Sequence, residues 1–147
     1  MTSADEGARN LMDTGVQLGR RFRALKLWMI LRSFGARAIR EHLAEHVRLA
    51  RLFASWVDAH PDFERMAPVP FSVVCFRWNP RSGGFGIDLD RANQQLMDAV
   101  NATGEVFISS ARLHGAVALR VAVGNLKTTE RQVRRVWELL QSLVPSS

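Results

Sequence analysis

The chain has 147 residues, 47% hydrophobic and 23% charged, so it can bury a core and is too apolar to remain disordered. Its single cysteine, Cys75, excludes an internal disulfide framework and is typical of the reducing cytoplasm. No apolar run reaches the length of a membrane span, and the N-terminus lacks the order of a signal peptide, so we expect a cytoplasmic protein.

The net charge of +6 is distributed unevenly. Nine basic residues and two glutamates lie between Arg20 and Arg51, which gives this stretch a charge of +7 and leaves the remainder near neutral. Such a patch can attract nucleic acid or an anionic membrane. Arginines that pair with acidic surface elsewhere, or that line a subunit interface, explain it as well. No nucleic-acid motif accompanies the patch, so we expect neither a nucleic-acid nor a membrane partner.

Residues 1–15 are small and polar and are expected to form a flexible leader. A first helix is predicted from about Val16 or Leu18 to Phe34, with Gly35 as the residue that ends it. This helix is basic and also apolar on almost every side. Other protein must therefore cover it.

A second, amphipathic helix is predicted over residues 36–59, because apolar residues recur every three or four positions along it. This stripe consists of Ile39, Leu43, Val47, Ala50, Phe53 and Val57. Pro61 ends the helix, since a proline disfavours the helical conformation of the residue before it. Residues 71–78 are dense in β-formers and predict a strand, which a glycine-rich loop over 79–86 follows.

The last part of the chain predicts a helix, a hairpin and a final helix. Asp88 is expected to cap a helix that runs to about Ala102 and stops at Gly104, with Leu89, Leu96 and Val100 facing inward. Two β-runs, 105–113 and 116–123, flank His114-Gly115 and predict a hairpin.

Thr128 or Thr129 caps the last helix, and Thr129 with Gln132 fits a capping box. Its buried stripe consists of Val133, Val136, Trp137 and Leu140. The element order over residues 36–147 predicts an α+β domain with a mostly antiparallel sheet of three or more strands and helices on one face. The helix over residues 16–35 precedes this domain and is expected to extend away from it, toward other protein.

Few residues offer chemistry. His42-Leu-Ala-Glu-His46 matches the pattern of one zinc-peptidase class, and two histidines four apart on a helix can share a metal. No third ligand is evident, so we favour two surface histidines, with Glu45 as a solvated charge. Cys75 alternates within a strand and is interpreted as a small apolar filler rather than a nucleophile.

Two further patterns have ordinary structural explanations. Gly83-Gly84-Phe85-Gly86 is not followed by the Lys-Ser/Thr of a phosphate-binding loop, so a surface loop is favoured. Asp88 and Asp90 can bind a cation weakly, but the start of a helix explains them better. The sequence therefore predicts no catalytic residue and no metal site in this chain.

Several blocks in order resemble the C-terminal portion of pyridoxal-phosphate-dependent aromatic-L-amino-acid decarboxylases, the group II decarboxylases. These blocks are Gly15 to Gly35, with Leu-Gly-Arg-Arg-Phe-Arg-Ala-Leu-Lys-Leu-Trp at its centre, His46-Val-Arg-Leu-Ala50, Val73-Val-Cys-Phe-Arg77, Asn101 to Phe107, Ala118 to Asn125 and Thr128 to Trp137. The resemblance implies the C-terminal small domain of a fold-type I enzyme, with residues 16–35 as the linker helix to a large domain that this chain lacks.

The resemblance also implies what is missing. In the family a lysine forms the Schiff base, an aspartate meets the pyridinium nitrogen, a histidine stacks on the ring and a mobile loop carries a tyrosine, all upstream of Leu18-Gly-Arg-Arg21. Neither lysine of this chain, Lys26 or Lys127, matches the Schiff-base lysine, and the chain has no tyrosine. We therefore expect pyridoxal 5'-phosphate to be the cofactor of the parent family and not to bind this chain alone.

One position carries over to the substrate. Gly19 matches the family glycine that lines the substrate side-chain pocket near the dimer interface, where it leaves room for an aromatic ring. Arg20 and Arg21 match the adjacent arginines and are interpreted as structural or interface groups. Thr14 stands where many relatives have an aromatic residue, which weakens inference about that side of the pocket.

Two hypotheses follow. In the first, the chain is the C-terminal part of a decarboxylase of aromatic L-amino acids. It is inactive alone and is completed by the large domain of the same enzyme, a homodimer in the parent family. In the second, the chain is a non-catalytic interaction module whose basic first helix binds a protein partner or an anionic surface.

Overall fold

A computed structural model describes residues 22–81 and 88–144, and the chain divides into two compact units, Met1–Arg37 and Ala38–Ser147. The expected leader over residues 1–15, the start of the first helix and the glycine-rich loop lie largely or wholly outside the described residues. Helix α1 spans Arg23–Ala59 and contains one non-helical residue, Gly35, with φ 76° and ψ 151°. The prediction that two helices meet at Gly35 is confirmed.

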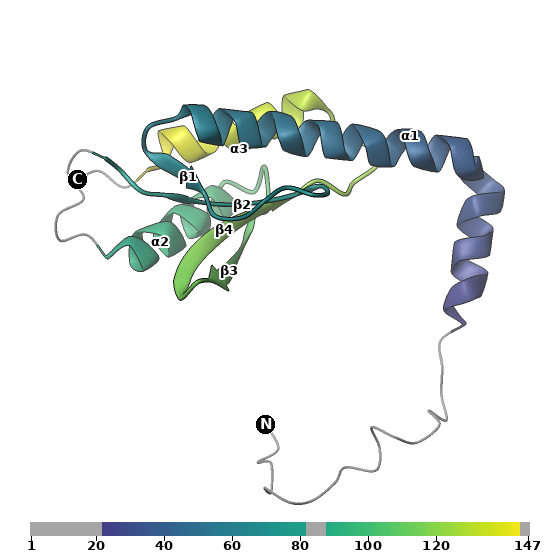
Figure 1. The fold of residues 1–147 in the computed structure, drawn as a ribbon, viewed down its shortest axis with the longest axis horizontal. Helices are drawn as coiled ribbons and strands as arrows, with labels where there is room; N and C mark the ends of the chain where they lie inside the picture. Colours follow the sequence, from purple (N-terminus) through teal and green to yellow (C-terminus); the bar gives the residue numbers. More distant parts are fainter. Residues whose placement is uncertain (1–21, 82–87, 145–147) are drawn as a thin grey trace, which may run out of the picture. The chain divides into compact units, whose positions relative to one another are not determined.

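Within the second unit, α1 is followed by β1 (Phe63–Arg65), β2 (Val73–Trp78), α2 (Leu89–Ala102), β3 (Ser109–Leu113), β4 (Ala116–Ala122) and α3 (Glu130–Ser142). The four strands form one antiparallel sheet in the order β1-β2-β4-β3 (Figure 1). The predicted mostly antiparallel α+β domain is thereby confirmed.

The sheet has one buried face. Val74, Phe76 and Trp78 of β2 are buried, and their neighbours in the register on β4, Val121 and Leu119, are buried as well. This face and the three helices contribute to a single core: Leu49, Phe53 and Val57 of α1, Leu96 and Val100 of α2, and Val133, Leu139 and Leu140 of α3. The helices therefore cover one face, as predicted, and the opposite face carries Cys75, Arg77 and Arg120.

Aromatic rings join α1, the sheet and α3 at the centre of the core. The ring of Phe53 lies 5.3 Å from that of Phe76 and 5.7 Å from that of Trp137, both edge-on. Phe63 of β1 lies 5.1 Å from Trp137. Edge-to-face pairs at such spacings add to the free energy of area burial, so this cluster fixes how the helical layer packs on the sheet.

The predicted caps and turns are present. The Asp88 carboxylate accepts a hydrogen bond from the Arg91 backbone N–H at 3.1 Å and caps α2. Gly104, at φ 70°, follows α2, and His114 and Gly115 take positive φ values at the hairpin turn. The Gln132 side chain accepts from the Thr129 backbone N–H at 3.0 Å, which identifies Thr129 as the cap of α3.

Three strand predictions need correction. β1 was not predicted; its three residues, Phe-Glu-Arg, carry no β-pattern and are held by pairing with β2. β2 begins at Val73 rather than residue 71. β3 begins at Ser109 rather than residue 105, because the Asn101 side chain bonds both the N–H and the C=O of Ile108, at 2.8 and 2.9 Å, in place of a neighbouring strand.

Candidate functional site

The predicted substrate-pocket residue, Gly19, lies outside the described residues, and so do its neighbours Arg20 and Arg21 and the divergent Thr14. The role of Gly19 therefore stays a prediction.

The histidine motif on α1 is used for packing. His46 is only 7% exposed, and its Nε2 lies 3.2 Å from the backbone carbonyl oxygen of Asn125 in the segment after β4. The expectation that both histidines lie on the surface is thus wrong for His46, because this contact encloses the ring. Over the described ranges, no group of three or more His, Cys, Asp or Glu side chains could hold a metal ion.

Glu45 of the same motif is occupied by an arginine. Its carboxylate accepts two hydrogen bonds from Arg48, both at 2.8 Å. These bonds lower the pKa of Glu45 below its ordinary value, because they favour the charged form. A carboxylate held in this way is not poised to act as a general base near neutral pH.

The remaining candidates also have structural roles or no partner for chemistry. Cys75 is a free, half-buried thiol on the open face of the sheet, opposite Arg120 in the register. Asp88 caps α2, as predicted. Asp90 accepts from the Val117 backbone N–H at 2.8 Å and lies 3.5 Å from the guanidinium of Arg112, so it ties α2 to the hairpin.

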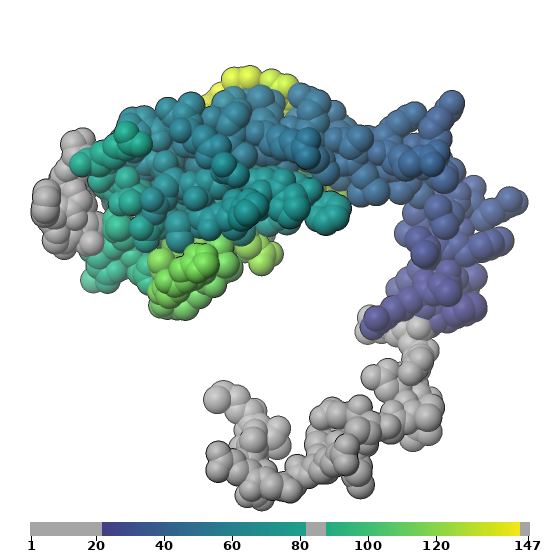
Figure 2. Space-filling model, in the orientation of Figure 1, coloured from purple at the N-terminus to yellow at the C-terminus, as the bar shows by residue number. Residues whose placement is uncertain are grey.

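The described part of the first unit exposes an unusual number of large apolar side chains. Trp28 is 58% exposed and Phe22 70% exposed. The others are Leu25, Leu27, Met29, Ile30, Leu31 and Phe34, all exposed between 42% and 60%. Figure 2 shows this part of the chain in purple and dark blue, with side chains standing out from the helix. Monomeric proteins rarely leave so large an apolar surface free, so this segment, residues 22–34, is a candidate docking surface.

Among the described residues, the carboxylates are paired, whereas several of the cations are not. Each described carboxylate has a hydrogen bond or ion pair, as in the pair of bonds from Arg135 to Glu105 at 2.7 and 2.8 Å. Several cations have none, among them Arg23, Lys26, Arg51 and Arg120. The unpaired charge of the described residues is therefore basic on each of the two units and favours an anionic partner.

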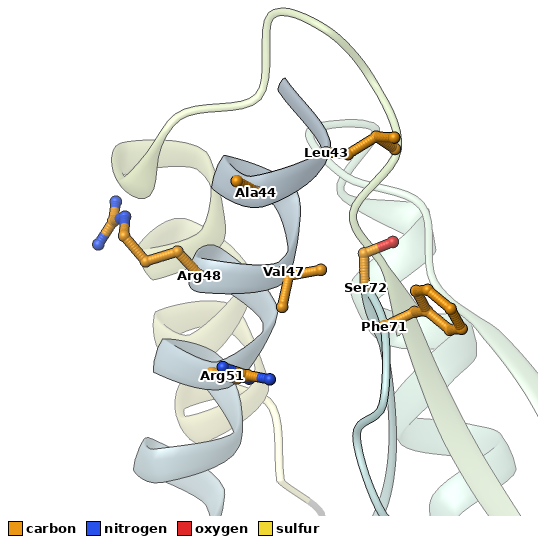
Figure 3. Close-up of a pocket in the computed structure, with 7 residues that line it drawn as sticks. All are labelled: Leu43, Ala44, Val47, Arg48, Arg51, Phe71 and Ser72. Atoms are coloured by element: carbon orange, nitrogen blue, oxygen red, sulfur yellow. The ribbon is translucent and has the colours of Figure 1, made fainter. Parts of the chain in front are cut away.

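A second apolar surface lies on the second unit. Leu43, Ala44 and Val47 of α1 face Phe71 and Ser72 at the start of β2 across a groove of about 480 Å³ (Figure 3). Phe71 is 75% exposed and Leu43 58% exposed. Leu43 and Val47 belong to the apolar stripe predicted for this helix, and the structure leaves this end of the stripe open.

Comparison with known proteins identifies the chain. The model of the pyridoxal-dependent decarboxylase conserved domain matches residues 2–79. The chain is 40% identical, over 128 residues, to the aromatic-L-amino-acid decarboxylase of Catharanthus roseus, covering 87% of this chain and 25% of that protein. It is 39% identical to the phenylacetaldehyde synthase of Arabidopsis thaliana, covering 88% of this chain and 26% of that protein.

A solved structure agrees. The crystal structure of Catharanthus roseus tryptophan decarboxylase in complex with L-tryptophan superposes with a TM-score of 0.77 at 39% identity, covering 91% of this chain and 28% of that chain. The fold is thus that of the C-terminal part of pyridoxal-phosphate enzymes of fold-type I. This chain belongs to the pyridoxal-dependent decarboxylase family, as a C-terminal portion that spans about a quarter of the length of the relatives it matches.

The residues described do not fit the cofactor of the family. Pyridoxal phosphate is held by a lysine amine that forms a Schiff base and by a charged side chain at its pyridine nitrogen. Lys26 lies in the first unit, and Lys127 lies in the exposed segment after β4, where its backbone N–H donates to Asn125. Neither lines the groove beside Phe71, and the described carboxylates are already engaged.

No helix in the described ranges is long and apolar enough to cross a membrane.

Proposed function

We propose that this chain is the C-terminal part of a cytoplasmic decarboxylase of aromatic L-amino acids, and that it acts only when joined by the cofactor-bearing remainder of that enzyme. The remainder is proposed to supply the Schiff-base lysine, and the completed enzyme to be a homodimer. Gly19 is proposed to line the substrate side-chain pocket.

The observation that carries the proposal is the exposed apolar segment 22–34, in a chain that spans a quarter of its relatives. A helix that exposes Leu27, Trp28 and Ile30 together has the composition of a buried helix, so its natural environment is the interior of a larger protein. The family supplies the identity of that protein, because this chain matches about a quarter of its decarboxylase relatives.

The proposed contribution of this chain to the enzyme is structural rather than chemical. The sheet and helices of the second unit form a core of their own. The segment 22–34 of the first unit is proposed to contact the remainder. The chemistry of carbanion stabilisation belongs to the cofactor, which these residues do not hold.

The test is complementation. The full chain is mixed with the Catharanthus roseus decarboxylase truncated before the quarter that this chain matches and loaded with pyridoxal phosphate. Release of CO₂ from L-tryptophan or L-tyrosine is then measured. We expect release from the mixture and none from either component. Absence of release, together with salt-sensitive binding of the chain to anionic lipid vesicles, would instead support the non-catalytic interaction module.

A further inference from the structure

The groove on the second unit has apolar walls and one basic rim. Val47 points from α1 toward Ser72 and Phe71, while Arg51 lies one helical turn further along the same side (Figure 3). The core beneath is closed, since Leu49, Ala50 and Phe53 are fully buried. The groove is thus a feature of the surface rather than a gap in the packing.

Its two arginines differ in availability. Arg48 is held by Glu45 and also lies 3.6 Å from Glu130. Arg51 has no ion pair or hydrogen bond within the described residues. A free guanidinium beside an apolar groove is suited to a carboxylate, which it binds through two parallel hydrogen bonds.

A second copy of this chain does not supply that carboxylate from the described residues, because their carboxylates are already engaged. Two copies that paired through this groove would instead bring their unpaired Arg51 side chains together, which is unfavourable. The other apolar surface, the segment 22–34, carries Arg23 and Lys26 and no acidic residue. Both surfaces therefore call for the same kind of partner, one with apolar side chains edged by carboxylates.

We propose that the groove between α1 and the start of β2 is a docking site for an apolar polypeptide segment edged by a carboxylate, with Arg51 as the residue that pairs with it. The segment belongs to the cofactor-bearing remainder of the enzyme, so this inference rests on the proposed function. It adds a second contact to that of the segment 22–34, on the other compact unit of the chain.

The experiment compares four variants of the full chain in binding to the truncated, pyridoxal-phosphate-loaded Catharanthus roseus decarboxylase. Phe71→Glu and Arg51→Glu alter the groove. Phe107→Glu and Arg91→Glu are matched controls, since Phe107 is 85% exposed, Arg91 is an exposed arginine without an ion pair, and neither lines the groove. Affinity is measured by anisotropy of the labelled truncated protein, and thermal unfolding confirms that each variant is folded.

We expect each groove variant to weaken binding about tenfold or more, as buried anchors and paired charges do, and both controls to bind like the unaltered chain. If the unaltered chain binds and all four variants bind equally well, the groove is not the docking site, and the proposed function is unaffected. Failure of the unaltered chain to bind overturns both. A dimer of the chain alone that Phe71→Glu dissociates would assign the groove to a second copy and overturn the inference.

Discussion

Asn93 is a fully buried amide that holds α2 to the sheet. Its Oδ1 accepts from the Trp78 backbone N–H at 2.8 Å, and its Nδ2 donates to the Trp78 carbonyl at 2.9 Å and to the Leu89 carbonyl at 2.8 Å. Asn93→Ala leaves both Trp78 groups without this partner. We expect it to lower the free energy of unfolding by about 2–3 kcal/mol, measured by urea denaturation.

The control is Gln94→Ala, the exposed neighbour that bonds only Asp98. It is expected to change stability by less than about 0.5 kcal/mol. Asn93→Asp keeps the acceptor but replaces the donor with a buried charge, so it should destabilise at least as much as alanine at neutral pH. A stability of Asn93→Ala close to that of Gln94→Ala would contradict this account.

Glu105 and Arg135 link the segment before β3 to α3. Hydrogen bonds from Arg135 are the main cause that lowers the pKa of Glu105 below the ordinary 4.5. A lowered folded pKa gives stability that is present above the unfolded value and is lost as the pH falls through the folded one. We therefore expect Glu105→Gln to flatten the dependence of unfolding free energy on pH below about pH 4.5. Parallel pH profiles for the two proteins would argue against the pairing.

At the scale of single residues, local signals predicted the helix caps but not the buried polar residues that join distant elements, Asn93 and His46. Asp88, Gly104 and Thr129 act on their own helix termini, so sequence spacing is sufficient to find them. Asn93 stands on the same stripe as Leu89 and Leu96, and a polar residue on an apolar stripe is a sequence signal for such a buried hydrogen-bonding group. His46 was assigned to the surface because its partner, the Asn125 carbonyl, lies 79 positions away.

At the scale of elements, α3 tests the capping prediction. Thr129 precedes the helix, and the Gln132 side chain returns to its backbone N–H. Thr129→Ala is expected to lower the free energy of unfolding by about 1 kcal/mol, because a capping oxygen at the N-terminus is lost. The matched control is the adjacent Thr128→Ala, which leaves the capping box intact. The free energy of unfolding of both variants is measured by chemical denaturation. A larger decrease for Thr128→Ala than for Thr129→Ala would identify Thr128 as the cap.

Elements with local causes were predicted, and elements made by distant pairing were not. The hairpin turn needs only His114-Gly115, whose positive φ values suit this turn. β1 exists because Phe63, Glu64 and Arg65 pair with Trp78, Arg77 and Phe76. Its sequence has no alternation that could have been recognised. The open groove could not be predicted either, because periodicity locates an apolar stripe without showing which end of it stays uncovered.

At the scale of the whole molecule, the two compact units expose different surfaces with the same charge. The fold and family followed from ordered blocks of sequence, whereas the role of Gly19 depends on a pocket completed elsewhere. The described carboxylates are all engaged, and the charges that remain free among the described residues are cations. The proposed function therefore predicts a partner that carries carboxylates, and mixing the chain with that partner tests it.

The isolated chain is expected to self-associate, and more strongly as salt rises. The segment 22–34 exposes Trp28, Leu31 and Phe34, and large exposed apolar surfaces drive association. The same segment carries Arg23 and Lys26, whose repulsion between copies is screened when the Debye length shrinks from about 10 Å at 0.1 M salt to about 3 Å at 1 M. Sedimentation velocity at these two ionic strengths measures the effect.

Binding to nucleic acid or to anionic lipid has the opposite dependence on salt, so the sign separates the two explanations of the basic segment. Trp28→Glu with Leu31→Glu should abolish the association, whereas Phe107→Glu, at a more exposed apolar site on the other unit, should leave it unchanged. Addition of the cofactor-bearing partner should also suppress it, because the partner competes for the same side chains. A chain that stays monomeric at both ionic strengths would show that the segment 22–34 needs no cover, and the case for a missing remainder would lose its main support.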